Sequence, residues 1–224
     1  TGMWGAQGVL AALYERQRTG QGQKVECSLL ETAVAFSSWT SAGWLADRVE
    51  PARMGSRHRQ NAPYQRFETK DGYMMIGAAG QGIWERCAKA LGHPEWADDP
   101  RFRRGPDRRK NRFVLEKEIT AVLATAPSAH WIKALDDAGV PCGPVYNYEQ
   151  LFADPQVQHR EMVVHVDDAE LGRVPHIRTP VRMSASDVSV RVTAPKLGQH
   201  TDKILAGLGY ASIDIDALRR DRVV

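Results

Sequence analysis

The segment from residue 53 to residue 77, RMGSRHRQNAPYQRFETKDGYMMIG, constrains the fold more than any other part of the chain. Residues 64–68 and 73–77 are rich in aromatic and other apolar side chains and are predicted as strands. Between them, the dipeptide Asp71-Gly72 favours a tight turn. The segment therefore predicts a β-hairpin, and a polar stretch rich in Arg, His, Gln and Asn leads into it.

Apolar periodicity predicts helices on both sides of the hairpin. Residues 2–18 and 29–46 are predicted as helices, with a short strand at residues 23–28 between them. The second helix is apolar nearly all round, so we expect it to be buried or to lie at an interface. The elements predicted after the hairpin are helices in the ranges 83–91, 111–123, 128–138 and 147–153, antiparallel strands at 162–166 and 172–177, and terminal helices at 201–208 and 213–220.

Two stretches without strong periodicity, residues 47–63 and 184–196, flank this middle part of the chain. Both have the composition of linkers, and the first is rich in Arg, Pro and Gly. Two linkers around a compact block predict a small inserted α+β domain. The two ends of the chain would then belong to another body.

The overall charge of the chain excludes two classes of function. Thirty basic and 27 acidic residues give a formal net charge of +3 over 224 residues, so global charge supports neither nucleic-acid nor membrane binding. No apolar run reaches the length of a membrane span. Three widely spaced cysteines, without a CxxC pair, argue against a zinc site or a disulfide framework. We therefore expect a cytoplasmic protein without a metal.

The polar stretch before the hairpin holds the best candidate site. Arg57 can hold a carboxylate in a bidentate pair, and Asn61 can donate to a developing oxyanion. His58 can act as a base or as a hydrogen-bond donor. The alternative is a solvated linker, in which Arg and Gln are common. The residue types alone do not decide between these two interpretations.

Two further stretches invite a binding function, and a plainer interpretation is favoured for each. Residues 77–82 (GAAGQG) stand between a strand and a helix, but they match no phosphate-binding motif and are predicted to be an ordinary turn. Residues 101–112 contain seven basic side chains and one acid. A run of this kind is more often a solvated loop and helix start than a phosphate-binding patch.

In its motifs, the chain resembles the class III CoA-transferases, a family that includes formyl-CoA and carnitine CoA-transferases and 2-methylacyl-CoA racemases. Besides residues 53–77, the resemblance rests on GVLAALYERQRTGQGQKVECSLL (8–30), PEWADDPRF (94–102), GVPCGPVYN (139–147), ADPQV (153–157) and LGQHTD (197–202). Their order and spacing make the resemblance specific. Within the family, the chain is most similar to the dicarboxylate group typified by succinyl-CoA:glutarate CoA-transferase.

The resemblance implies a fold that combines α/β and α+β parts. The family has a large Rossmann-type domain linked twice to a small α+β domain, and its ring-shaped chains interlock as homodimers. Under this interpretation the chain is the C-terminal portion of such an enzyme. The implied ranges are 1–45 for the end of the large domain, 46–63 for a linker, 64–180 for the small domain, 181–196 for the return linker, and 197–224 for helices that pack on the large domain.

The resemblance also implies a chemistry. The family transfers CoA between carboxylic acids through a covalent intermediate on an aspartate, and CoA is a substrate rather than a bound cofactor. The matching aspartate would lie about three residues before Thr1, so no catalytic residue is expected in this chain, and the fragment alone is expected to be inactive. An acyl-CoA racemase of the same family and a non-catalytic interaction module remain as alternatives.

For the substrate site, the resemblance implies that the polar stretch meets the acyl group. Formyl-CoA transferases carry a run of glycines where this chain has GSRHRQ (55–60). We therefore expect Arg57, His58 and Asn61 to line the acyl pocket, with Gly55 and Tyr64 shaping it. The expected partners are an acyl-CoA, a carboxylic acid and a second copy of the chain.

Overall fold

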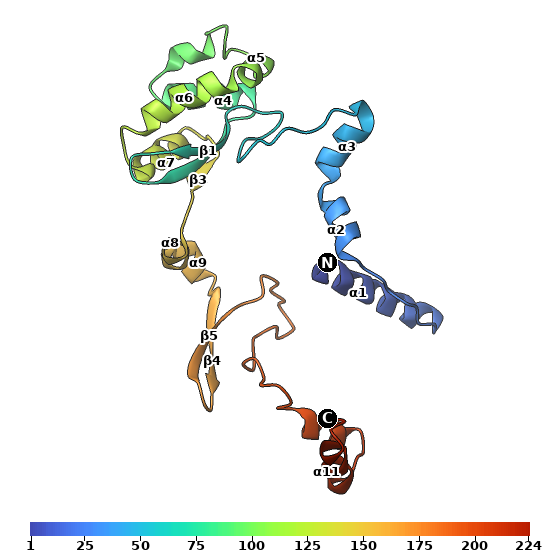
Figure 1. The fold of residues 1–224 in the computed structure, drawn as a ribbon. Helices are drawn as coiled ribbons and strands as arrows, with labels where there is room; N and C mark the ends of the chain where they lie inside the picture. Colours follow the sequence, from blue (N-terminus) through green and yellow to red (C-terminus); the bar gives the residue numbers. More distant parts are fainter. The chain divides into compact units, whose positions relative to one another are not determined.

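The computed structural model describes residues 1–224, which divide into two compact units, residues 1–144 and residues 145–224. The dividing point falls inside the range 64–180 that the sequence assigned to one small domain. The assignment of the predicted ranges to the large and small domains of a complete protein stays a prediction. Each unit is described by itself (Figure 1).

The first unit contains a three-stranded antiparallel sheet in the order β1-β2-β3. Strands β1 (Tyr64–Glu68) and β2 (Tyr73–Gly77) form the predicted hairpin, and the Thr69 N–H donates to the Gly72 carbonyl at 2.9 Å to close its turn. Strand β3 (Cys142–Pro144) pairs with β2. The sequence prediction treated β3 as loop, because three residues that include Gly and Pro carry no strand pattern of their own.

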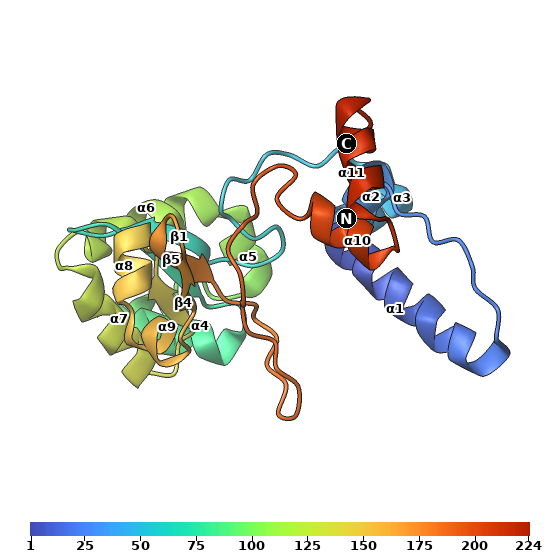
Figure 2. The ribbon, with the colours of Figure 1, turned by 90° about the horizontal axis from the view of Figure 1, so that it is seen from below.

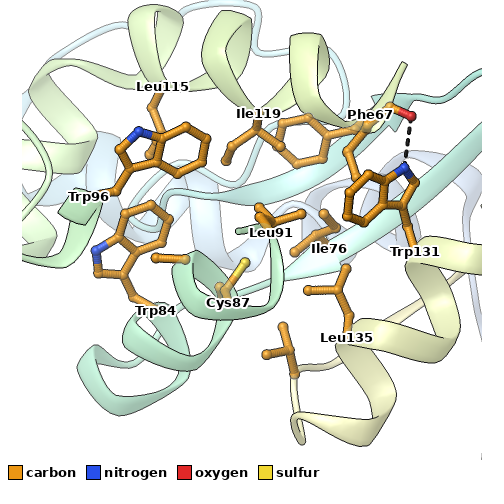
Figure 3. Packing of buried hydrophobic residues seen from close by; sticks show 14 of the residues in the cluster. Phe67, Ile76, Trp84, Cys87, Leu91, Trp96, Leu115, Ile119, Trp131 and Leu135 are labelled. Atoms are coloured by element: carbon orange, nitrogen blue, oxygen red, sulfur yellow. Dashed lines mark hydrogen bonds between the residues drawn. The ribbon is translucent and has the colours of Figure 1, made fainter. Parts of the chain in front are cut away.

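Helices cover this sheet and enclose a single apolar core. They are α4 (Gln81–Ala90), η1 (Pro94–Ala97), α5 (Gly105–Lys110), α6 (Arg112–Leu123) and α7 (Ser128–Asp137). Leu115, Ile119 and Leu123 form one buried stripe of α6 at helical spacing, and they belong to the same core cluster as Phe67 and Ile76 of the hairpin. Figure 3 shows Ile119 beside Phe67. Burying each such side chain contributes roughly 1.5–3 kcal/mol, so this cluster is the main source of stability in the unit.

Aromatic rings stack in the same core. Trp84 and Trp96 lie nearly parallel, with an interplanar angle of 2° and ring centroids 6.4 Å apart. His93 stacks on Trp96, with ring centroids 4.3 Å apart. The indole N–H of Trp131 is satisfied by the Leu123 carbonyl at 2.9 Å (Figure 3). The indole N–H of Trp84, in contrast, is buried without a hydrogen-bond partner.

The N-terminal part of the first unit departs from the prediction in two ways. Helix α1 (Gly2–Thr19) ends at Gly20, which adopts a left-handed conformation (φ 75°), as expected. Residues 21–28 form no strand, because no second strand pairs with them. The predicted helix at 29–46 is two helices, α2 (Leu29–Phe36) and α3 (Ser38–Asp47), interrupted at Ser37, whose hydroxyl donates back to the Val34 carbonyl at 2.8 Å.

These three helices bury no side chain within this chain. Leu29 is 80% exposed and Trp39 is 66% exposed, although the sequence led us to expect a buried or interfacial helix. These side chains are therefore not buried within the first unit, and the expectation that the helix lies at an interface stays a prediction. No helix of the structure is both long enough and apolar enough to cross a membrane.

The second unit holds short helices and a hairpin. Helix α8 (Tyr148–Ala153) begins as predicted at Asn147, which forms a capping box with Gln150, and α9 (Pro155–His159) follows. Strands β4 (Val163–Asp168) and β5 (Gly172–Ile177) form the predicted antiparallel pair. Helices α10 (Thr201–Gly207) and α11 (Ser212–Arg220) end the chain and contact each other (Figure 2).

Candidate functional site

The candidate site is the loop of residues 55–64, here called the site loop, which leads into β1. Gly55 opens it in a left-handed conformation (φ 59°), as a turn at this point requires. The next turn is closed by the Arg57 N–H, which donates to the Met54 carbonyl at 3.2 Å. Ala62 and Pro63 near its end are buried, and the Ala78 N–H after β2 donates to the Pro63 carbonyl at 2.9 Å. The loop is therefore tied to the sheet at its end.

Arg57 already holds a carboxylate within the chain. Its Nε and Nη2 atoms each donate to one oxygen of Glu116 on α6 at 2.8 Å. The guanidinium also lies over the Phe113 ring, 5.1 Å from its centroid. The sequence predicted a bidentate carboxylate pair for Arg57, and the structure places a side chain of α6 in that position. In this arrangement Arg57 fixes the loop to α6, and its fork is occupied.

His58 is held with its Nδ1 atom facing the backbone of its own turn. The N–H groups of Gln60 and Asn61 point to Nδ1, at 3.1 and 3.2 Å. Backbone N–H groups can only donate, so Nδ1 is an acceptor and the proton of the neutral ring lies on Nε2. The hydrogen-bond contacts of the His58 ring all involve Nδ1, and Nε2 has no protein partner. The structure therefore favours the donor role over the base role for this side chain.

Asn61 and Tyr64 stand beside His58. The Asn61 amide nitrogen lies 3.3 Å from His58 Nδ1, and the amide oxygen pairs with no protein group. The Tyr64 ring meets the His58 ring edge to face, with centroids 5.1 Å apart and planes at 72°. A Cβ on Gly77, which pairs with Tyr64 in the hairpin, would lie 2.4 Å from Tyr64 Cε2. Gly77 thus leaves the space that the Tyr64 ring occupies.

Arg108 on α5 donates a hydrogen bond to the end of the site loop. This residue was not identified from the sequence. Its side chain is only 1% exposed, and its Nε atom donates to the Ala62 carbonyl at 2.8 Å. Its Nη1 atom donates to the side chain of Gln81 and to the Phe102 carbonyl, both at 3.0 Å. Burial lowers the pKa of this guanidinium, because it carries no carboxylate partner to offset desolvation. The guanidinium also lies over the Trp84 ring.

Arg112, the first residue of α6, holds the middle of the site loop. Its Nη1 atom donates to the His58 carbonyl at 3.2 Å, and its Nη2 atom donates to the Arg59 carbonyl at 2.8 Å. Burial lowers the pKa of Arg112, and the nearby cations Arg109 and Arg57 lower it further. One guanidinium therefore fixes two consecutive carbonyl groups of the turn that carries His58.

The prediction of a solvated basic run at residues 101–112 is therefore wrong for two of its members. Arg108 and Arg112 turn inward because the site loop exposes carbonyl groups that no strand or helix satisfies. Arg112 and Glu116 lie four residues apart on α6, which is about one helical turn, so their spacing could have placed them on one face. Arg108 lies on α5, before the break at Asn111, and this spacing does not identify it.

The other stretches and side chains weighed as sites carry no comparable geometry. Residues 78–80 link β2 to α4 as the predicted strand-to-helix turn. Burial raises the pKa of the Cys87 thiol to about 12, which makes it a poor nucleophile. No group of three or more His, Cys, Asp and Glu side chains converges to hold a metal ion. The polar groups of the site loop remain the best candidate.

Comparison with known proteins agrees with this architecture. The chain is 34% identical over 205 residues to the succinyl-CoA:glutarate CoA-transferase of Mus musculus, covering 92% of this chain and 47% of that protein. It is 30% identical over 213 residues to the succinate–glutarate CoA-transferase of Agrobacterium fabrum, covering 93% of this chain and 52% of that protein. The chain therefore spans about half the length of these curated relatives.

A solved structure shares the fold. The crystal structure of a CaiB/BaiF family protein from Brucella suis superimposes with a TM-score of 0.76 at 32% sequence identity, covering 93% of this chain and 54% of that one. The family model described as CoA-transferase family III matches residues 1–201. The fold and family expected from the sequence are confirmed: the chain belongs to CoA-transferase family III.

Proposed function

We propose that the complete protein containing this chain is an enzyme that transfers CoA between carboxylic acids, with dicarboxylates as the preferred acids. The observation that carries the proposal is the family match over residues 1–201, which includes the whole site loop. Curated relatives named for succinate and glutarate support the dicarboxylate class. The Nε2–H group of His58, which donates to no protein acceptor, supports a contact with a carboxylate or a carbonyl.

In the proposed mechanism, the carboxylate of an aspartate that precedes this chain attacks the thioester carbonyl carbon of the acyl-CoA. The C–S bond breaks, CoA leaves as its thiolate, and an acyl anhydride remains. The thiolate attacks the aspartyl carbonyl carbon, releases the first acid and forms an enzyme-bound thioester. The acceptor carboxylate repeats the two steps in reverse order, and the new acyl-CoA and the free aspartate result.

In this mechanism the site loop binds and orients the acyl group. His58 and Asn61 contact its polar end, while Gly55 and Tyr64 shape the wall of the pocket. Arg57 contributes in one of two ways. Either it keeps its pair with Glu116 and fixes the loop, or it exchanges Glu116 for a substrate carboxylate. A bidentate Arg–carboxylate pair would suit both roles.

The remaining elements of the proposal concern the complete protein. Residues 1–45 and 197–224 would belong to its large Rossmann-type domain, and residues 64–180 to its small domain. Residues 46–63 and 181–196 would be the linkers between these domains. We further propose an interlocked homodimer in the cytoplasm that uses CoA only as a substrate.

The test is to incubate the complete enzyme with succinyl-CoA and glutarate and to follow the formation of glutaryl-CoA. Hydroxylamine added during turnover should trap the aspartyl thioester as a hydroxamate, found by mass spectrometry of the peptides. Exchange of an α-proton of a 2-methylacyl-CoA in D₂O, without CoA transfer, would instead identify a racemase. A folded protein that catalyses neither reaction would refute enzymatic function.

A further inference from the structure

The turn that carries His58 is held by its own N–H groups and by distant side chains. Within it, the His58 N–H donates to the Tyr64 carbonyl at 2.9 Å, and the N–H groups of Gln60 and Asn61 donate to His58 Nδ1. Residues 57–62 form no strand or helix, and no N–H group of the loop donates to the carbonyl groups of His58, Arg59 and Ala62. Arginine side chains from α5 and α6 satisfy all three carbonyl groups. The shape of this turn therefore depends on cations more than forty residues away in the sequence.

Arg112 is the arginine whose side chain donates to the His58 carbonyl. Its two donor atoms span consecutive carbonyl groups, and it adjoins the Arg57–Glu116 pair through its position on α6. Because the His58 carbonyl is fixed, the backbone of the next three residues can direct two N–H groups at His58 Nδ1. Those two donors determine which ring nitrogen carries the proton.

We propose that Arg112 is a positioning residue that holds His58 as an Nε2–H hydrogen-bond donor toward the carboxylate of the acid substrate. The substrate part of this inference rests on the proposed function, whereas the tautomer of His58 does not. A neutral imidazole of this kind donates its Nε2–H to an oxyanion and removes no proton from the substrate. His58 then serves in recognition of the acid and not as a base.

The first arm of the test uses the complete enzyme with ¹⁵N-labelled histidine. Wild type should show the Nε2–H tautomer for His58 in two-bond ¹H–¹⁵N spectra, with the signal assigned from a His58→Gln spectrum. Arg112→Gln should replace this pattern by a mixture of tautomers, and Arg112→Lys should lie between the two. Arg109→Gln is the matched control, because Arg109 is exposed and its one loop contact, to the Gln60 carbonyl, is 3.5 Å long.

The second arm measures kinetics on the same proteins. Arg112→Gln should raise the KM for the acceptor acid by about 10- to 100-fold, the range for loss of one charge-assisted hydrogen bond, and change kcat less. His58→Gln keeps an N–H near the position of Nε2, so it should retain most of the affinity that His58→Leu loses. Arg109→Gln should match wild type.

Three results would overturn the inference. One is an unchanged His58 tautomer and KM in Arg112→Gln, even if its melting temperature falls, because the role of Arg112 would then be structural only. Another is an equal effect of Arg109→Gln, and the third is an equal loss in His58→Gln and His58→Leu, as a base would show. If wild type transfers no CoA, the proposed function fails, and the tautomer spectra still decide the role of Arg112.

Discussion

Replacement of Arg108 by Met should destabilise the first unit more than any other single change in the basic run. The buried guanidinium donates to the carbonyl groups of Ala62 and Phe102 and to the side chain of Gln81, at 2.8 to 3.0 Å. Methionine fills much of the volume but leaves these acceptors unpaired, at about 1–3 kcal/mol for each buried group. Relief of the buried charge offsets part of this loss, so we expect a net loss of about 3 kcal/mol.

The measurement is urea denaturation followed by tryptophan fluorescence. Trp84 lies 5.2 Å from the Arg108 guanidinium, so its emission reports on the region of the substitution. A loss of about 3 kcal/mol corresponds to a midpoint lower by roughly 1–3 M urea, given a typical m-value of about 1–3 kcal/mol per M. The melting temperature should fall by roughly 6–12 °C for a unit of this size.

The matched control is Arg109→Met at the next position, because Arg109 is exposed and makes one weak contact with the site loop. It should change stability by less than about 0.5 kcal/mol, as is usual for surface positions. Equal midpoints for the two variants would refute the reasoning, because removal of a buried hydrogen-bonded cation would then cost no more than removal of an exposed one.

Three further predictions test other parts of the structure. Gly77→Ala should displace the Tyr64 ring and raise the KM for the acid severalfold. Gly143→Ala on β3 is the control, because the added methyl group meets open space and should leave the KM unchanged. Equal KM values for the two variants would contradict a role of the Tyr64 ring in shaping the site. The pKa of Asp71 is lowered because the backbone N–H and the hydroxyl of Ser128 donate to its carboxylate. The ionised carboxylate therefore stabilises the folded state fully above its ordinary pKa of 3.8, and this stabilisation is lost as the pH falls through the lower pKa of the folded state. Asp71→Asn should therefore flatten the fall in melting temperature below about pH 4, and an unchanged slope would count against it. The isolated chain should self-associate through the apolar faces of α1, α2 and α3, and a monomer in size-exclusion chromatography would contradict this.

Local signals predicted the hairpin from the sequence but not its register, because Thr69 and Gly72 close the turn and Lys70-Asp71, not Asp71-Gly72, are its central residues. Apolar side chains in residues 64–68 and 73–77 and a two-residue turn signal lie within fourteen positions, so the pairing needs no distant information. Strand β3 could not be predicted in the same way, because its sequence has no strand pattern and only its pairing with β2 makes it a strand. The helix breaks at Ser37, whose hydroxyl donates to the Val34 carbonyl. The pattern of apolar residues carries no information about this hydrogen bond, so the break was not predicted.

The sequence selected the residues of the candidate site, whose role stays a prediction, and it did not show which side chains support them. The polar types of Arg57, His58 and Asn61 identified the loop, and no local pattern showed that Glu116 would occupy the Arg57 fork. The inward orientation of Arg108 follows from unsatisfied carbonyl groups elsewhere in the chain. A prediction that treats a basic run as a solvated surface does not detect hydrogen bonds from its arginines to carbonyl groups distant in the sequence.

The dependence of the site loop on α6 has a consequence for biosynthesis. Arg112 lies 53 residues after Arg59, whose carbonyl it binds. At a translation rate of about 5–20 residues per second, the loop waits roughly 3–10 s for this partner to be made. During that interval the carbonyl groups of His58 and Arg59 lack their arginine partner, so a chaperone or protease can meet the loop before it reaches its final shape.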